Sequence, residues 1–227
     1  MMIKKFEHLN IDLGYEDLTA DTSASGRVYS TPDGKYPSIT TVLSILSEDG
    51  IRAWRARVGE EEANKISRIA STRGTKVHAI IEKYLNNEEN YAEDYLPNIL
   101  GNFQDIKPIL DNRLNKILAQ EVPLYSNHLR VAGRVDCIGE FDNTISVIDF
   151  KTSRKLKKKE WIDGYFIQAS AYAIMFEERT GIPITQLVVL IAVDNEAPQV
   201  FIEHRDNWTQ KLLETIKEYE TRKIFGR

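Results

Sequence analysis

The spacing of apolar residues divides the chain into a first half with a helical period and a second half dominated by strand-like segments. In the first half, apolar positions recur every three or four residues and predict helices over 40–46, 51–58, 60–71, 75–86 and 96–119, the last in one or two pieces around Pro108. A hairpin is predicted over 26–39, with a turn at Thr31-Pro32-Asp33-Gly34, and Ser38 or Thr40 should cap the next helix. Residues 1–25 carry few regular signals.

The second half alternates short strand patterns with two amphipathic helices. Strands are predicted over 121–126, 129–141, 144–153, 184–193 and 199–203, and helices over 161–180 and 208–224. Pro123 favours an edge position for its strand. This order of elements predicts an α/β (α+β) fold, in which helices flank a central mixed β-sheet. We expect a single domain over 1–227, with a mainly helical N-terminal part over 1–118 and the sheet with its flanking helices over 119–227.

Two strands sharing a tight turn, residues 133–153, contain the most informative pattern. The turn is predicted at Asp142-Asn143, a dipeptide that tolerates left-handed conformations. A two-residue or four-residue loop at this point sets Asp136 directly opposite Asp149 and Arg134 opposite Lys151. A loop of odd length would separate the two aspartates. The alternation of side chains predicts that the buried face carries the apolar residues Val131, Val135, Cys137, Phe141, Ile148 and Phe150, and that the carboxylates share the other face.

The opposed aspartates require a compensating charge. Carboxylates about 5 Å apart on neighbouring strands repel by roughly 3 kcal/mol at an effective dielectric near 20, more than a favourable cross-strand pair contributes. A divalent cation with hard oxygen ligands, magnesium or manganese, offsets this most simply. The alternative is an ordinary surface pair neutralised by Arg134 and Lys151.

The composition excludes several classes of protein. A single cysteine rules out a disulfide framework and any four-cysteine zinc or iron–sulfur site, and Cys137 is expected to be inert core packing. No segment has the long apolar run of a signal peptide or membrane span, and the start lacks a mitochondrial presequence, so we expect a cytoplasmic protein. The net charge of -4 gives no overall basic footprint for nucleic acid. A local basic run nevertheless follows Lys151: Arg154, Lys155, Lys157, Lys158 and Lys159.

Three further patterns add polar groups near this hairpin. A two-residue turn at Asn127-His128 would pair Glu121 with Arg134, beside the aspartates, whereas a three-residue turn would move Glu121 to the other face. His78 and Glu82 lie one turn apart on a predicted helix and project from the same face. An amide and a phenol, Gln168 and Tyr172, are likewise four residues apart on the helix after the hairpin.

Four short motifs bring these residues together in one order along 74–172. They are Gly-Thr-x-x-His ending at His78, Gly-Arg-Val-Asp ending at Asp136, Asp149-Phe150-Lys151, and Gln168-x-x-x-Tyr172. Together they resemble the PD-(D/E)xK nuclease superfamily, specifically its RecB-like branch. Val135 stands where the superfamily's name has a proline, which is common in this branch. The cysteine count excludes the CRISPR adaptation nucleases that carry an iron–sulfur cluster. The segment Tyr36–Leu43 is similar to an N-terminal motif of phage exonucleases related to the mitochondrial genome maintenance exonuclease.

The resemblance implies a restriction-endonuclease-like core and a magnesium or manganese site. Asp136, Asp149 and the Phe150 carbonyl would hold the metal, with His78 as an additional ligand. Glu121 would hold a second ion or orient water.

The same resemblance assigns roles to residues around the metal. Lys151 would orient the attacking water and neutralise the phosphate, while Gln168 and Tyr172 would position the DNA strand or the lysine. The residues expected to bind substrate are Arg134, Thr152, Arg154, Lys155, Gln168 and Tyr172.

The expected activity is metal-dependent hydrolysis of DNA phosphodiester bonds. A single-strand-specific exonuclease of replication, repair or recombination, from a bacterium or phage, is the leading interpretation. The helical first half could arch over the site and admit only a threaded strand. Two alternatives remain: a structure-selective or sequence-specific endonuclease on the same core, and a catalytically silent DNA-binding protein.

Overall fold

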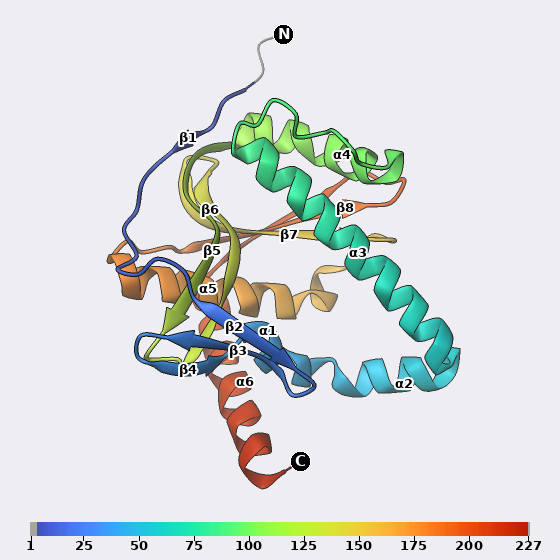
Figure 1. The fold of residues 1–227 in the computed structure, drawn as a ribbon, viewed down its shortest axis with the longest axis vertical. Coiled ribbons are helices and arrows are strands. Elements are labelled where there is room, and N and C mark those ends of the chain that lie inside the picture. The colour runs from blue at the N-terminus through green and yellow to red at the C-terminus, as the bar shows by residue number, and fades with distance from the viewer. Residues whose placement is uncertain (1–3, 227) are drawn as a thin grey trace.

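A six-stranded mixed sheet forms the centre of the protein in the computed structural model, which describes residues 4–226 (Figure 1). Its strands lie in the order β1-β5-β6-β7-β8-β9. The β7–β8 and β1–β5 pairs are parallel and the others antiparallel, so the predicted mixed sheet is confirmed. The strands are β1 (Glu7–His8), β5 (Leu114–Ser126), β6 (Val131–Phe141), β7 (Thr144–Ser153), β8 (Gln186–Val193) and β9 (Gln199–His204).

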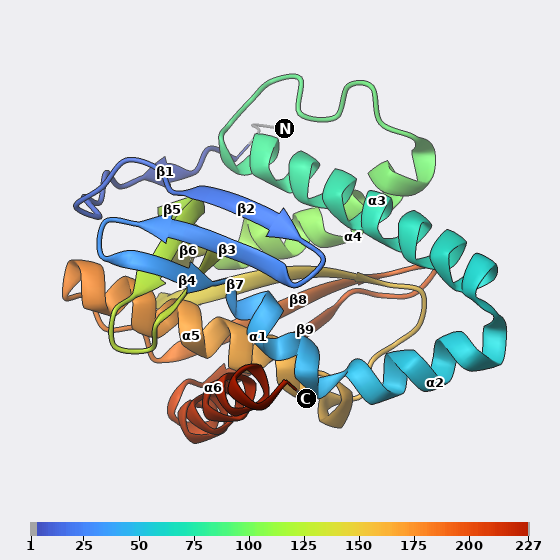
Figure 2. The same cartoon turned by 60° about the horizontal axis from the view of Figure 1, so that its bottom comes forward.

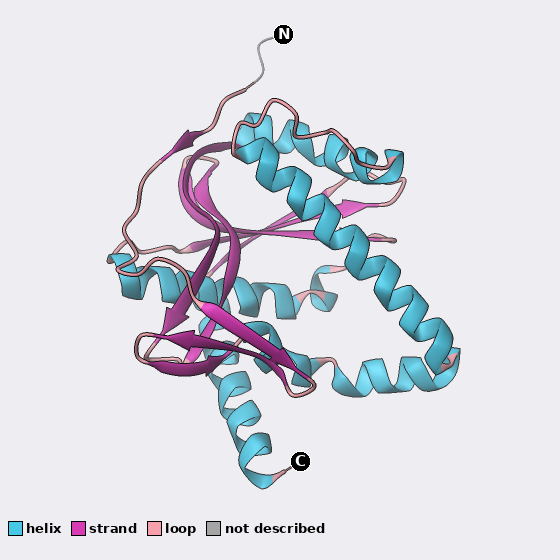
Figure 3. Ribbon diagram, in the orientation of Figure 1, coloured by secondary structure: helices cyan, strands magenta, loops and turns pink. Residues whose placement is uncertain are grey.

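Helices cover both faces of this sheet (Figure 3). On one face, α4 (Pro97–Arg113) and the second half of α3 (Glu60–Leu85) pack on a cluster that contains Cys137, Ile148 and Phe150. On the other, α5 (Asp163–Thr180) and α6 (Asp206–Phe225) join a cluster that contains Val135 and Val147. The hairpin therefore has no solvated face. The carboxylates were predicted to share the face opposite the buried apolar one; helices pack on both faces, so both are buried.

The six residues predicted to share one buried face are divided between the two clusters. Val131 and Val135 pack with α5, whereas Cys137, Phe141, Ile148 and Phe150 pack with α3 and α4. Simple alternation fails along β6, whose long path curves across the protein (Figure 1). Cys137 is fully buried, as expected for core packing.

A second, three-stranded sheet lies in the N-terminal half. It consists of β2 (Thr19–Ser23), β3 (Gly26–Thr31) and β4 (Gly34–Pro37). The β3–β4 hairpin and its turn were predicted, and the pairing of Thr31 with Gly34 confirms them. Ser38 then caps α1 (Ile39–Leu43) by accepting a hydrogen bond from the Thr41 N–H at 3.0 Å. The N-terminal half thus contains more strand than the apolar pattern predicted.

Two helices form an arm that extends from the body (Figure 2). A short 3₁₀ helix, η1 (Ser44–Leu46), leads from α1 into α2 (Glu48–Val58), which meets α3 at Gly59. We define the arm as residues 48–76; within it only Ala63 is buried. The sequence predicted a break near Gly74, but α3 runs through this position as one helix of 26 residues, about 39 Å long at 1.5 Å per residue.

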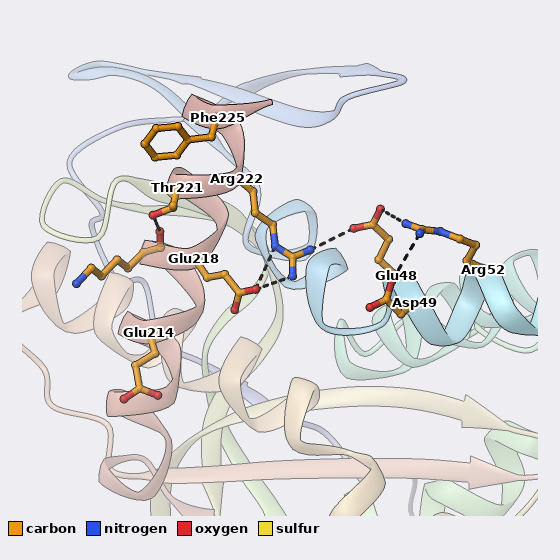
Figure 4. Close-up of a pocket in the computed structure, with 9 residues that line it drawn as sticks. Glu48, Asp49, Arg52, Glu214, Glu218, Thr221, Arg222 and Phe225 are labelled. Atoms are coloured by element: carbon orange, nitrogen blue, oxygen red, sulfur yellow. Dashed lines mark hydrogen bonds and ion pairs between the residues drawn. The ribbon is translucent and has the colours of Figure 1, made fainter. Parts of the chain in front are cut away.

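Ion pairs fasten the base of the arm to α6 (Figure 4). Arg222 of α6 contacts Glu218 on its own helix at 2.5 Å and Glu48 of α2 at 3.3 Å. Glu48 also pairs with Arg52 at 3.0 Å. These contacts connect the start of the arm to the end of the chain.

A long strand replaces the end of one predicted helix. The sequence predicted helix as far as residue 119, but α4 ends at Arg113 and β5 begins at Leu114. Leu114 and Ile117 face the α3–α4 cluster while Leu118 and Ala119 face the α5 cluster, so this segment is buried on both sides. Local spacing cannot distinguish such a strand from a buried helix. No described helix is long and apolar enough to cross a membrane.

Candidate active site

The β6–β7 hairpin follows the predicted register up to the site and then separates. Five pairs run from Phe141 with Thr144 to Cys137 with Ile148. Asp142 and Asn143 both have positive φ, 51° and 62°, as a tight primed turn requires.

Backbone pairing does not continue to the predicted opposition of Asp136 and Asp149. Instead, Oδ2 of Asp136 accepts a hydrogen bond from the Phe150 N–H at 2.8 Å. The carboxylate thus occupies the place of a strand partner and closes the end of the ladder. The predicted pairing of Arg134 with Lys151 is also absent, because β6 and β7 stop pairing at Cys137 and Ile148.

Glu121 reaches the site through a register different from the predicted one. The turn between β5 and β6 is four residues long and pairs Ser126 with Val131, where a two-residue turn at Asn127-His128 was expected. Gln120 pairs with Cys137 and Val122 with Val135, which sets Glu121 beside Asp136. A shift of two residues keeps a side chain on the same face of a strand, so Glu121 still faces the site.

The backbone of Glu121 is held in an unusual conformation. Its φ of 48° is left-handed, which is costly for a residue with a side chain and is retained only where the surroundings impose it. Arg134 supplies part of that constraint, because its guanidinium donates to the Glu121 carbonyl and also to Asp17 at 3.1 Å. Arg134 therefore faces Glu121 and Asp17 rather than Lys151.

His78 enters the site from α3, on the opposite side of β7 from α5. Its Nε2 lies 2.8 Å from the Phe150 carbonyl oxygen, which can only accept, so Nε2 carries the proton. In the neutral ring Nδ1 then carries the lone pair, and it lies 3.5 Å from Oδ1 of Asp136. A second ring nitrogen bonded to a backbone carbonyl is the usual arrangement of a metal-binding histidine. The Phe150 carbonyl, predicted as a ligand, bonds to His78 here.

His78, Glu121 and Asp136 form a cluster of possible metal ligands. One donor atom from each lies within 4.8 Å of the others. Burial, together with repulsion from Asp136 and Glu82, raises the pKa of Glu121 to about 7 against the opposing influence of Arg134. Two carboxylates and a nitrogen lone pair converging in this way repel one another, and a hard divalent cation would relieve that repulsion.

Asp149 and Lys151 lie beside this cluster and pair with each other. Lys151 Nζ donates to Oδ1 of Asp149 at 2.5 Å, and the aspartate side chain is only 2% exposed. Burial raises the pKa of Asp149 despite the attraction of Lys151. Burial alone would lower the pKa of Lys151, but the charges of Asp149 and Asp136 outweigh it and raise the pKa. Lys151 is therefore a protonated, positioned donor.

The surroundings of the second oxygen of Asp149 indicate that a metal ion fits the candidate active site. Oδ2 is buried and has no hydrogen-bond partner among the described residues. An ionised oxygen without a partner is costly to bury, and coordination to a cation would compensate for it. The oxygen donors of Glu121, Asp136 and Asp149 and the imidazole nitrogen of His78 are of the types suited to magnesium or manganese.

A row of side chains on α5 covers Lys151. Tyr165 was not identified from the sequence, yet Lys151 Nζ lies 5.2 Å from the centre of its ring. Gln168 Nε2 donates to the Tyr172 hydroxyl at 3.4 Å, and Tyr172 is buried. Tyr165 precedes Gln168 by three residues and Tyr172 by seven, a spacing that puts all three on one helical face. That spacing was the available signal.

The remaining predicted substrate contacts lie along the exit of β7. Thr152 is half-buried, with its hydroxyl 3.8 Å from the position of a Cβ on Gly74 of α3. Arg154 and Lys155 are exposed. Farther along the basic run, Lys159 pairs with Glu203. The structure thus gathers His78, Glu121, Asp136, Asp149, Lys151, Gln168 and Tyr172, and leaves Arg134, Arg154 and Lys155 around them.

Comparisons with known proteins bear on this arrangement. The profile of the PD-(D/E)XK nuclease superfamily matches residues 88–225. The Mus musculus protein mitochondrial genome maintenance exonuclease 1 is 26% identical over an alignment of 145 residues, and the match covers 60% of this chain and 43% of the mouse protein. This chain therefore spans less than half of that relative. A crystal structure of an exonuclease candidate from Eubacterium rectale aligns with 67% of this chain and 65% of its own, at 18% identity and a TM-score of 0.45.

The region matched by the family profile runs from before α4 to the end of α6 and makes up more than half of the chain. It contains the two strands and the helix that position Asp136, Asp149, Lys151, Gln168 and Tyr172. The sequence motifs, the mixed sheet flanked by helices and the profile match agree, and the chain belongs to the PD-(D/E)XK nuclease superfamily.

Proposed function

We propose that this nuclease is a magnesium- or manganese-dependent exonuclease that hydrolyses phosphodiester bonds in single-stranded DNA or at free DNA ends. The observation that carries the chemistry is the convergence of His78, Glu121 and Asp136 beside the buried pair of Asp149 and Lys151. Hydrolysis of a phosphodiester needs an activated water and neutralised charge on phosphorus. The carboxylates and His78 supply ligands for the metal that would activate the water. Lys151 supplies the positive charge that would neutralise the phosphorus centre.

Nδ1 of His78, the carboxylates of Glu121 and Asp136, and Oδ2 of Asp149 would hold the metal. When bound, it would lower the pKa of a water molecule and polarise the phosphate.

The protein's own groups then orient the reaction. Lys151 is held by Asp149 and by the ring of Tyr165, and its raised pKa keeps it protonated. A protonated lysine at this position binds a phosphate oxygen and opposes the negative charge that develops on phosphorus. Gln168 and Tyr172 lie on the same face of α5 and orient the neighbouring part of the DNA strand.

The arm supports a requirement for a free end. It connects α1, on one side of β7, to α3 on the other (Figure 2), and the second half of α3 bears His78. The arm buries almost none of its side chains, so its surface is available to a ligand. A continuous loop of chain around a site favours a strand that enters by its end. The phage-like motif at Tyr36–Leu43 supports a role in bacterial or phage DNA replication, repair or recombination, within the cytoplasm.

Digestion of single-stranded oligonucleotides blocked at the 5′ or the 3′ end, in magnesium, tests the proposal. The wild-type protein should degrade strands with one particular end free, whereas Lys151→Ala and Asp149→Asn should reduce cleavage by at least a hundredfold. Lys217→Ala, at an exposed position on α6, is the matched control. Undiminished cleavage by both site variants would refute the chemistry.

Two other activities would give different results in the same experiments. An endonuclease on this core would cut covalently closed single-stranded circles as fast as linear strands. A silent DNA-binding protein would bind DNA without cleaving it and would show no manganese binding by calorimetry.

A further inference from the structure

We propose that a groove between the α1–η1 segment and the start of α5, with Trp161 at its side, binds one unpaired nucleobase of the DNA strand. This inference rests on the proposed function and deepens it, because it assigns the preference for single strands to one surface. The phosphate of a neighbouring nucleotide would lie at Lys151.

The groove has the size and lining of a small-ligand site. Its volume is about 710 Å³, within the range of pockets that accept nucleotide-sized molecules. Leu43 and Leu46 line one wall, and Ile162 and Ile167 line the other. Apolar walls of this kind suit the flat, weakly hydrated faces of a nucleobase.

The groove is continuous with the candidate active site. Tyr165 and Gln168 line the groove and also belong to the row that covers the active site. Lys151 Nζ lies 5.2 Å from the centre of the Tyr165 ring. A ligand in the groove is therefore separated from Lys151 by a single side chain, which places its base within one or two nucleotides of the scissile phosphate.

Trp161 provides a stacking surface beside basic residues. It lies in the short 3₁₀ helix η2 (Lys159–Trp161), and 63% of it is exposed, which is unusual for so large an apolar side chain. Lys158 Nζ lies 5.2 Å from the centre of its ring. An exposed aromatic ring next to lysines is the combination by which proteins bind single strands: bases stack on the ring and phosphates contact the cations.

The acidic residues of the groove do not oppose this assignment. Asp163 is paired with Lys211 at 2.5 Å, and Glu160 lies 4.0 Å from Lys158. Their charges are thus balanced locally. Lys155 and Arg154, exposed in the loop that leads to η2, give the approach to the groove a positive charge.

A base can enter the groove only if it leaves its stack and its pairing partner. In a duplex this costs a few kcal/mol, and in a single strand much less. The groove would therefore select unpaired DNA without reading sequence, since every base has a flat face.

Stepwise replacement of nucleotides by abasic sites tests the inference. A series of single-stranded oligonucleotides carries one abasic site, moved by one position from strand to strand. For the wild-type protein we expect kcat/KM to fall about 5- to 150-fold at one position near the scissile bond. Trp161→Ala should be slower on the intact strand by a similar factor and insensitive to that abasic site, whereas Trp161→Phe should retain most of the sensitivity. Phe225→Ala, which removes an exposed aromatic ring on α6, is the control and should behave as wild type.

A binding measurement supplies a readout independent of cleavage. With wild-type protein in a chelator, 2-aminopurine at the sensitive position should lose fluorescence on binding because it stacks, and Trp161→Ala should abolish that loss. An active wild-type enzyme with a flat abasic profile, or a Trp161→Ala variant with the wild-type profile, would overturn the inference. A wild-type protein that cleaves no DNA would instead refute the proposed function.

Discussion

Oδ2 of Asp136 accepts a hydrogen bond from the backbone N–H of Phe150 at 2.8 Å, at the point where β6 and β7 stop pairing. The same side chain turns Oδ1 toward His78. Asp136 thus has a structural role through Oδ2 that is separable from the metal-binding role proposed for its charge.

Substitutions of Asp136 should separate these functions. Asp136→Asn keeps an oxygen acceptor for Phe150, so its unfolding free energy should stay within about 1 kcal/mol of wild type, while manganese binding falls below detection. Asp136→Ala leaves the Phe150 N–H without its acceptor and should cost a further 1–3 kcal/mol. Denaturant unfolding measures the unfolding free energy of each variant, and calorimetry measures its manganese binding. Equal destabilisation by the two variants would contradict the structural role of Oδ2.

Gly133 and Tyr172 connect two of the sequence motifs through a close contact. A Cβ on Gly133 would lie 2.8 Å from Cε1 and 2.9 Å from the hydroxyl of Tyr172, and 3.2 Å from Cγ2 of Ile39. Gly133→Ala should therefore destabilise the protein by about 1–3 kcal/mol, because the tyrosine ring is buried and cannot move freely. In a double-mutant cycle, part of this cost should disappear when Tyr172→Ala is already present.

Gly101→Ala provides the control for this prediction. Gly101 lies inside α4, and a Cβ there meets nothing within 4 Å. Alanine at such a helical position should be neutral or stabilising by up to about 1 kcal/mol. Thermal unfolding of both variants gives the comparison, and a similar loss of stability in both would show that Tyr172 is not the cause.

The parts of the site that depend on local patterns were predictable from the sequence. The Asp142-Asn143 turn fixed the register of five residue pairs because both residues tolerate positive φ. The turn before β6 was predicted at Asn127-His128, but it is two residues longer, because its left-handed residue is Arg130, with φ 55°, and no glycine or asparagine marks that position. The resulting error of two residues still left Glu121 on the correct face.

Other features depend on contacts that no local pattern records. All five residues of β2, Thr19–Ser23, are exposed, so this strand has no apolar alternation and is held by its backbone bonds to β3. Helix α3 continues through Gly74 where the sequence predicted a break. The end of β6–β7 pairing was also unpredictable, since the carboxylate of Asp136 replaces a backbone partner there.

Glu121 should make the stability of the metal-free protein depend on pH. Its pKa is raised from 4.5 to about 7 in the folded state, so the unfolded chain releases this proton at lower pH than the folded one. The associated stability is fully present below pH 4.5 and is lost as the pH rises through 7. We expect a loss of about 1–2 kcal/mol after allowing for solvent screening of a half-buried carboxylate.

Chemical denaturation in a chelator between pH 4.5 and 8 measures this dependence. Glu121→Gln should remove this fall of about 1–2 kcal/mol from the plot of unfolding free energy against pH. Glu61→Gln, at an exposed position on the arm, should leave the plot unchanged. Saturating manganese should also restore stability at pH 8, because a bound cation favours the ionised carboxylate. A profile unaltered by Glu121→Gln would exclude a raised pKa at this residue.

An ion pair between Arg73 and Asp194 should position His78. The Arg73 guanidinium lies 2.5 Å from Oδ2 of Asp194, just after β8, and Asp194 also bonds through its N–H to the Ser153 carbonyl at the end of β7. Arg73 is one and a half helical turns before His78 on α3. The pair thus joins the helix that carries His78 to the strand that carries Lys151, and its loss would let α3 move relative to the sheet.

Arg73→Gln should therefore weaken manganese binding by about tenfold or more and increase amide hydrogen exchange in α3 around His78. The Arg73 side chain is only 12% exposed, and its replacement leaves Asp194 without a charged partner. A stability loss of about 1–3 kcal/mol should therefore accompany the effect. Lys65→Ala is the control, since Lys65 forms an exposed pair with Glu62 at 3.8 Å on the same helix. It should leave manganese binding, hydrogen exchange and stability unchanged. The exchanged pair Arg73→Asp with Asp194→Arg should recover part of the metal affinity if the pair acts by holding α3. Unchanged manganese affinity in a destabilised Arg73→Gln protein would show that the ion pair stabilises the fold without positioning His78.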